Sequence, residues 1–455
     1  MVGDEIFLRD GALLDSAMKS MFEFSYDIDD RLKQLELERP VSPLSRILNA
    51  YLAVLSSEYS PSRSALEEVH SIRETFTSIS IPERAHLDVI EAWGSGEFNR
   101  AQRLLDALLI QFPKDILALF VGHQLDFFLG DAQSLRDRVG SAVTEFDRSD
   151  PMYGYLLGMF AFGLEECGWY ERALEVGHEA LDRAATDVWA LHAVVHSHEM
   201  RAEFYDGLDL LKNYESGWTG SNFFKPHNYW HKCLYLLEIG DIEGILGIYD
   251  SMINPPGAGI VALTLLDASA ILWRLFLDSV DVGDRFEKLC SAWEECLDEP
   301  FYVFNDCHAI MAFVGAGRFD LADKQVDILR NSIATSDLRR SNAVMTSAIG
   351  LPVAEAIVAF GRGDHRQVIE KLYPIRKEFY RFGGSHAQRD VFHRTLVESA
   401  ICLPDLSLAA NLVDQRIALK EGSPYNWFAK RRILMKLGDP NQALLAGSMG
   451  DSFVR

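Results

Sequence analysis

A short phrase recurs along this chain of 455 residues: an apolar segment with helical spacing ends at a glycine, a brief polar turn follows, and a second apolar segment begins. Glycine can adopt the left-handed backbone conformation that ends a helix, and a small residue at the crossing lets two helices pack closely. The clear copies of the phrase carry Gly96, Gly168, Gly240, Gly317, Gly363 and Gly438. The phrase predicts a succession of paired helices.

The copies follow one another at a regular distance. Gly96, Gly168 and Gly240 are 72 residues apart, and weaker turns at Gly130 and Ala202 divide these intervals near their midpoints. Each unit is therefore close to the roughly 34 residues of the tetratricopeptide repeat (TPR), a helix-turn-helix. We predict an all-α, TPR-like solenoid: a right-handed superhelix of antiparallel helix pairs, with tight closure around a polar lumen as one form of it.

The same spacing sets the predicted organisation of the chain. The step from Gly317 to Gly363 is 46 residues long, so we expect an insertion or a rearranged unit near residues 330–362. Residues 1–80 are expected to form an N-terminal helical cap. Because no long Pro/Ser-rich stretch reads as a linker, residues 81–455 are expected to form one continuous repeat array.

Composition restricts the partners and the compartment. Hydrophobic residues make up 48% and charged residues 24%, as in folded soluble proteins, and the net charge of -23 would repel phosphate backbones and anionic lipids. We therefore predict no nucleic-acid partner and no membrane partner. The six cysteines include no CxxC pair, and residues 1–10 lack the apolar region of a secretion signal, so we expect a cytoplasmic protein.

Six stretches have a more specific pattern than the repeat phrase. They are 83–86 (ERAH), 112–119 (FPKDILAL), 192–200 (HAVVHSHEM), 227–231 (HNYWH), 304–308 (FNDCH) and 383–392 (GGSHAQRDVF). In these stretches the chain resembles the tetratricopeptide repeat protein 38 family, and the resemblance covers almost the whole chain. It implies an α-helical repeat fold and carries no particular activity.

Polar residues gather on the first helix of several predicted pairs, the helix that lines the concave face of such arrays. Residues three or four positions apart share a helix face, as in the pairs His192/His196, His196/Glu199 and His227/His231. The candidate catalytic residues are His192, His196, Glu199, His227, His231, Asp306, His308 and Arg389. The candidate ligand-binding residues are His123, Asn228, Trp230, Asn305, Ser385, Gln388 and Asp390.

Three interpretations of these residues stay open. His192, His196 and Glu199 have the spacing of a three-ligand transition-metal site with an open position, although the sequence favours a site without metal. Without metal, an imidazole tuned by Glu199 or Asp306 would act as general acid or base while Arg389 holds an anionic group. In the third interpretation, the side chains only satisfy one another's hydrogen bonds in a packed interior.

The function we predict is binding of a small polar molecule or a peptide segment in a histidine-rich concave pocket. The alternative is a metabolic enzyme that uses the same His, Glu, Asp and Arg residues for acid-base or metal-assisted chemistry on a small substrate. An excess of histidine on inner helices favours a compact pocket over an open peptide groove. No cofactor is assigned by the sequence.

Overall fold

The computed structural model describes residues 12–297, 299–335, 337 and 339–454. The prediction of a cytoplasmic protein rests in part on residues 1–10, which lie outside the described residues. The helices of the first third are α1 (Ala12–Phe22), α2 (Ile28–Glu38), α3 (Leu44–Leu55), α4 (Tyr59–Thr75), α5 (Ile81–Gly94), α6 (Phe98–Gln111), α7 (Ile116–Leu129) and α8 (Ala132–Val143). Those of the middle are α9 (Tyr153–Glu166), α10 (Tyr170–Arg183), α11 (Val188–Met200), α12 (Phe204–Asn213), α13 (Glu215–Trp218), α14 (Lys225–Ile239), α15 (Ile242–Ile248), the π-helical turn η2 (Tyr249–Ile253), α16 (Ala262–Leu277) and α17 (Arg285–Cys296).

The remaining helices are α18 (Val303–Gly315), α19 (Phe319–Thr335), α20 (Ser341–Met345), the π-helical turn η3 (Thr346–Gly350), α21 (Leu351–Gly361), α22 (His365–Ile375), the 3-10 turn η4 (Phe379–Phe382), α23 (His386–Cys402), α24 (Ser407–Leu419), α25 (Pro424–Lys436) and α26 (Pro440–Phe453). Within the described residues, extended pairing is limited to an isolated bridge between Ser25 and Asn222. The prediction of an all-α fold is confirmed.

The repeated phrase works as a pair of helix caps. Gly130 and Gly240 end α7 and α14 with positive φ angles of 66° and 82°. The next residues, Asp131 and Asp241, then accept backbone N–H bonds at the starts of α8 and α15. Ala202 takes the same left-handed conformation, with φ of 59°, where the sequence predicted a weaker turn.

The helix pairs form an inner and an outer layer. Inner helices such as α9 and α11 are buried at nearly every position, whereas the outer helix α10 buries one face, from Ala173 to Leu181. Each helix packs on its neighbour along the chain, and α9 also packs on α11, the inner helix of the next pair. This is the stacking expected of TPR-like units, which cannot cover their apolar faces alone.

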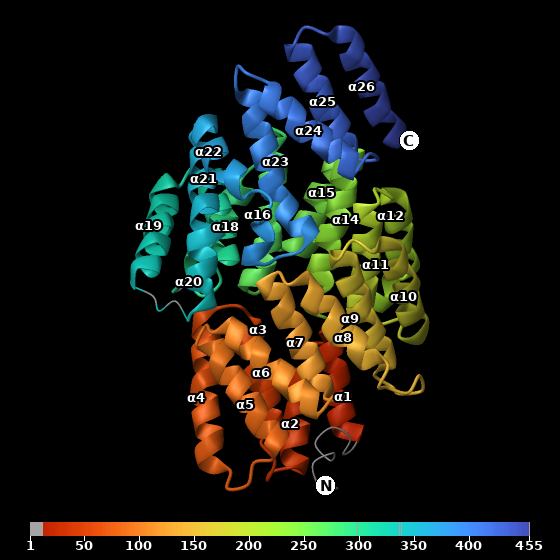
Figure 1. Ribbon diagram of the computed structural model, residues 1–455, viewed down its shortest axis with the longest axis vertical. Helices are drawn as coiled ribbons and strands as arrows, with labels where there is room; N and C mark the ends of the chain where they lie inside the picture. Colours follow the sequence, from red (N-terminus) through yellow and green to blue (C-terminus); the bar gives the residue numbers. More distant parts are fainter. Residues whose placement is uncertain (1–11, 298, 336, 338, 455) are drawn as a thin grey trace.

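The array curves until its last third meets its first (Figure 1). The backbone N–H of Ser341 donates to the carbonyl of Gly96 at 2.8 Å, and the N–H of His386 donates to Glu166 at 2.8 Å. The rings of Phe98 and Phe301 also pack edge to face, with centroids 5.4 Å apart. The solenoid is therefore closed on itself, and its inner helices surround a shared interior.

The long step in the repeat has a structural basis. The helix α19 has 17 residues, and α20, η3 and α21 join into one helix of 21 residues, Ser341–Gly361. This helix is long and apolar enough to cross a membrane by length and composition, but 61% of its apolar window is buried within the fold. It packs on α18, α19 and α22 as an inner helix of the array. The division of the chain at residue 80 stays a prediction.

Candidate functional site

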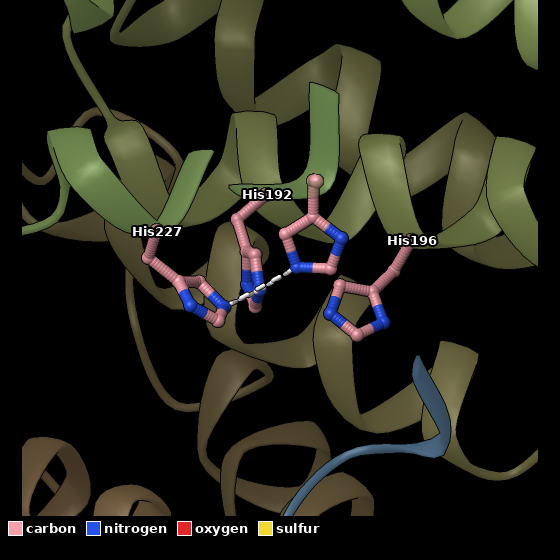
Figure 2. A group of neighbouring side chains, drawn as sticks. His192, His196 and His227 are labelled. Carbon is pink, nitrogen blue, oxygen red and sulfur yellow. Dashed lines mark hydrogen bonds between the residues drawn. The ribbon is translucent and has the colours of Figure 1, made fainter. Parts of the chain in front are cut away.

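Two neighbouring inner helices bring four imidazoles together, which we call the histidine cluster: His192 and His196 on α11, and His227 and His231 on α14. On each helix the two histidines are one turn apart and share the face that meets the other helix (Figure 2). The carboxylate of Asp187 holds the start of α11 by accepting the N–H groups of Trp189 and Ala190, each at 3.0 Å.

Three of the rings point the same nitrogen at one another. The Nε2 atoms of His192 and His227 lie 3.1 Å apart, those of His192 and His231 3.1 Å, and those of His227 and His231 3.2 Å. His196 completes the group, since one ring nitrogen from each of the four lies within 4.8 Å of the others. Figure 2 shows its ring beside that of His192, with a nitrogen turned toward it.

Carboxylates stand behind three of the four rings. Nδ1 of His227 lies 2.8 Å from Asp267 on α16, and Nδ1 of His231 lies 3.2 Å from Glu199 on α11. Nδ1 of His196 lies 3.5 Å from Glu165 on α9, an ion-pairing distance that is longer than a hydrogen bond. Asp267 and Glu199 orient the rings of His227 and His231 so that Nε2 of each is directed toward the other imidazoles.

Burial keeps three of the four imidazoles neutral. Loss of solvent, with a further contribution from neighbouring imidazoles, lowers the pKa of His192, His196 and His231 well below the ordinary value. Aromatic rings seal the group: Trp230 stacks on His227 at 5.3 Å, and Trp189 packs against His192 at 5.1 Å. His192, His196 and His231 are therefore buried neutral nitrogen ligands rather than a charged patch.

The structure separates the residues predicted as a metal site. His192 and His196 belong to the cluster, whereas Glu199 contacts the far nitrogen of His231 and so supports a ring. Among the other candidates, Trp230 is part of the aromatic wall, Asn228 is buried on α14, and His123 accepts the indole N–H of Trp189 at 3.2 Å. Asp267 and Glu165 were missed by the sequence analysis.

The candidates on α18 lie apart from the cluster and have partners of their own. The amide of Asn305 donates to the carbonyl of Ser57, Asp306 accepts from Gln325 at 2.7 Å, and Nδ1 of His308 donates to the Phe304 carbonyl at 2.8 Å. Burial raises the pKa of Asp306 to about 7 and lowers that of His308 to about 3. None of their hydrogen bonds within the described chain reaches the histidine cluster.

A cavity of about 480 Å³ lies next to the cluster, and Glu199 lines it. Its cationic lining residues are Arg274, Arg376, Lys377, Arg389, Arg394, Arg416 and Lys420, and its carboxylates are Glu199, Glu238 and Asp390. Glu199, Arg389 and Asp390 were predicted. Arg274 and Arg416 were missed because they come from other helices, α16 and α24, and Arg394 was missed although it lies on α23 one turn after Asp390. Ser385 and Gln388 instead form a capping box at the start of α23.

The charges of this cavity are incompletely balanced. Burial would raise the pKa of Asp390, but Arg416, Arg394 and Arg274 together hold it well below its ordinary value, so it stays a carboxylate. Arg394 also pairs with Glu238 at 2.9 Å. Arg274 donates to the carbonyls of Ala270 and Ala387 and makes no ion pair with a described carboxylate, and burial lowers its pKa to about 10. It is therefore a buried cation held by neutral groups.

No family model matches the chain. Among solved structures it is similar to a human IFIT1 dimer with PPP-AAAA, at 16% identity and a TM-score of 0.38 over 99% of this chain and 92% of that one. It is also similar to the APC/C hetero-tetramer Cut9–Hcn1, at 13% identity and a TM-score of 0.36 over 99% of this chain and 89% of that one. The description of this chain as a TPR-like helical repeat protein follows from its own helices and their stacking.

Proposed function

We propose that the protein binds a small polar molecule that carries negative charge, in the cavity beside the histidine cluster. The observation that carries this proposal is the charge of the lining: it holds five arginines and two lysines but three carboxylates, inside a chain of net charge -23. Arg389 pairs with Glu166 outside the lining, and Arg394 and Arg416 pair with Glu238 and Asp390, which leaves Arg274 as the buried guanidinium without an ion pair among the described carboxylates. A concentration of guanidinium groups against the overall charge is costly unless it serves recognition, because like charges repel in a low-dielectric interior.

The size and chemistry of the cavity suit a small ligand. Its volume of about 480 Å³ falls within the range of roughly 300–1,000 Å³ typical of small-molecule sites. Guanidinium groups bind carboxylate and phosphate oxygens with two parallel hydrogen bonds, so a planar or tetrahedral anion fits this lining. Such an anion would give Arg274 the ionic partner that the described carboxylates do not provide.

This position also favours binding over catalysis. The lining includes the predicted residues Glu199, Arg389 and Asp390 and the histidines His386 and His393, but the four imidazoles of the histidine cluster, on which the predicted chemistry rested, are not part of it. A general acid or base must come within hydrogen-bond reach of the reacting group. The enzymatic alternative is therefore placed second, and a peptide segment is disfavoured by the limited volume.

We also propose that the chain is a member of the tetratricopeptide repeat protein 38 family. Three of the six stretches behind that resemblance, 192–200, 227–231 and 383–392, supply the histidine cluster and five residues of the cavity lining. Their place at one interior site gives the shared pattern a physical reason. An alignment with sequences of that family tests the proposal, which fails if these positions vary while the surrounding repeats align.

A thermal-shift screen tests the ligand. Inorganic phosphate, dicarboxylic acids and phosphorylated sugars should raise the melting temperature by mass action, since a ligand at 100 times its Kd adds about 2.7 kcal/mol to the free energy of unfolding. Arg376→Met should weaken the shift, because Arg376 is one of the five arginines that line the cavity, and since it is only half-buried the variant is expected to fold.

The matched control is Arg103→Met on the exposed face of α6, which should keep the full shift. A screen in which only neutral or cationic compounds stabilise the protein would contradict the proposal. It would also be contradicted if Arg376→Met kept the whole response to anions, or if Arg103→Met lost as much of it.

A further inference from the structure

We propose that the histidine cluster is a buried site for a divalent transition-metal ion of the zinc class, with His192, His227 and His231 bound through Nε2 and His196 as the fourth ligand. The set differs from the three residues that the sequence suggested, because α14 supplies two of the nitrogens and Glu199 is not among the ligands. The proposal concerns the fold itself and stands whether or not the neighbouring cavity binds an anion.

The spacing of the nitrogens fits a common central ion. Zinc binds histidine nitrogen at about 2.0–2.1 Å with tetrahedral geometry, which places any two ligand nitrogens about 3.3 Å apart. The three Nε2 atoms lie at mutual distances of 3.1, 3.1 and 3.2 Å. Three imidazoles from two helices thus form nearly one face of such a tetrahedron.

Hydrogen bonding alone does not explain this triangle. Nδ1 of His227 lies 2.8 Å from Asp267 and Nδ1 of His231 lies 3.2 Å from Glu199. In neutral rings that donate to these carboxylates through Nδ1, both Nε2 atoms are lone-pair acceptors, and they face each other at 3.2 Å. A single N–H on Nε2 of His192 can bridge to one of them well, but not to both. A cation that accepts all three lone pairs removes the repulsion.

His196 provides an independent observation. Its side chain is fully buried, and neither ring nitrogen has a hydrogen-bond partner among the described residues. Native proteins rarely leave a buried polar ring in that condition. The ring is held 4.3 Å from the rings of both His192 and His231, with Glu165 behind it. Coordination of the same ion would give one of its two ring nitrogens a partner.

The surroundings match those of known metal ligands. Metal-bound histidines usually donate the other ring N–H to a carboxylate, which fixes the tautomer and strengthens the ligand. Asp267, Glu199 and Glu165 hold these places behind three of the four rings.

The donor set indicates which ion is bound and what it does. Imidazole suits zinc, copper, nickel and iron, whereas magnesium and calcium take oxygen ligands. Four protein ligands without an open position are typical of structural sites. The ion would therefore join α11 to α14 and, through Asp267, to α16, fastening consecutive repeat units of the array.

Metal content and metal affinity test the proposal. The full chain, produced without a polyhistidine tag in medium containing zinc, should retain one equivalent of zinc after dialysis, measured by plasma mass spectrometry. X-ray absorption at the zinc edge should show nitrogen ligands with imidazole scattering. Zinc added to chelator-treated protein should raise the melting temperature.

Two variants and one control make the result specific. His227→Gln and His231→Gln should lose the retained zinc and the zinc-dependent shift, and His227 is the safer first choice because its side chain is partly exposed. His178→Gln, at an exposed histidine on α10, should retain both. Circular dichroism confirms that each variant is folded.

Failure of the wild-type chain to retain zinc, copper, nickel or iron would overturn the site. So would folded His227→Gln and His231→Gln variants that bind zinc as tightly as the wild type, or binding that is lost in His178→Gln.

Discussion

The histidine cluster and the polar group on α18 (Asn305, Asp306 and His308) occupy equivalent inner helices, yet they differ in how their polar atoms are satisfied. On α18, each side chain has at least one partner nearby: the carbonyl of Phe304 on its own helix, Gln325 on α19, or Ser57. Asn305 Oδ1 and His308 Nε2 have no partner among the described residues, but they do not face like atoms of a neighbouring helix in any described hydrogen bond. In the histidine cluster, three imidazoles direct their Nε2 atoms at one another.

The difference arises from what the neighbouring inner helix presents. The helix α14 places His227 and His231 opposite His192 and His196, so that matching pairs face each other across one helix contact. The residues of α18 instead meet the carbonyl, amide and hydroxyl groups that a buried polar side chain normally finds. A buried polar residue on an inner helix therefore indicates a ligand site when the neighbouring helix faces it with atoms of the same type, here imidazole nitrogens, rather than with complementary hydrogen-bond partners.

The largest effect we predict is a loss of metal affinity when a carboxylate behind the histidine cluster is removed. Asp267→Ala takes away the acceptor for Nδ1 of His227, 2.8 Å away, and loss of such a partner typically weakens metal binding by about 10–100-fold. Competition with a chromophoric zinc chelator measures the change. Asp306→Asn should leave zinc affinity unchanged, and an equal loss in that variant would remove the distinction between the two regions.

We expect Asp306, in the polar group on α18, to make the free energy of unfolding depend on pH. Burial raises the pKa of Asp306 from 3.8 to about 7, so between these values the folded state keeps a proton that the unfolded state releases. The free energy of unfolding then falls as pH rises through this window and levels above it. At about 1.4 kcal/mol per pH unit, the contribution lost between pH 6 and 8 is about 1–2 kcal/mol.

Comparison with Asp306→Asn isolates this contribution. The variant keeps an oxygen that can accept from Gln325 but does not titrate, so its urea-unfolding midpoint should vary less between pH 6 and 8 than that of the wild type. Parallel pH profiles for the two proteins would show that Asp306 does not titrate in this window.

The fold could be predicted from the sequence because its decisive signals are local. A glycine that ends one helix and an aspartate that caps the next act within a few residues, as at Gly130 and Asp131. The site could be predicted only in part, since convergence depends on which faces of distant helices meet. Asp267 could have been noticed in the sequence, because it is the one acidic residue in the largely apolar stretch 262–273 (ALTLLDASAILW). Nothing in that stretch indicated that its carboxylate would contact His227.

The smallest effects we predict are changes in the free energy of unfolding from substitutions in the turns that follow the inner helices α11 and α18. The turn after α18 uses Gly317 with φ of 71°, whereas the turn after α11 uses Ala202 with φ of 59°. A left-handed residue with a side chain costs roughly 1–2 kcal/mol relative to glycine. Gly317→Ala should therefore lower the free energy of unfolding by about 1 kcal/mol through the backbone alone, because a Cβ there meets no atom within 4 Å.

The reverse change after α11 should stabilise, though by less. Ala202→Gly relieves the same backbone strain but removes a methyl group that packs against the core, so we expect a gain of at most about 0.5 kcal/mol. Gly247→Ala in α15, where a Cβ also meets open space, should stabilise because its backbone is helical. Calorimetry of the three variants orders these effects. A destabilised Ala202→Gly would mean that packing, rather than backbone strain, dominates the turn that positions the histidine cluster.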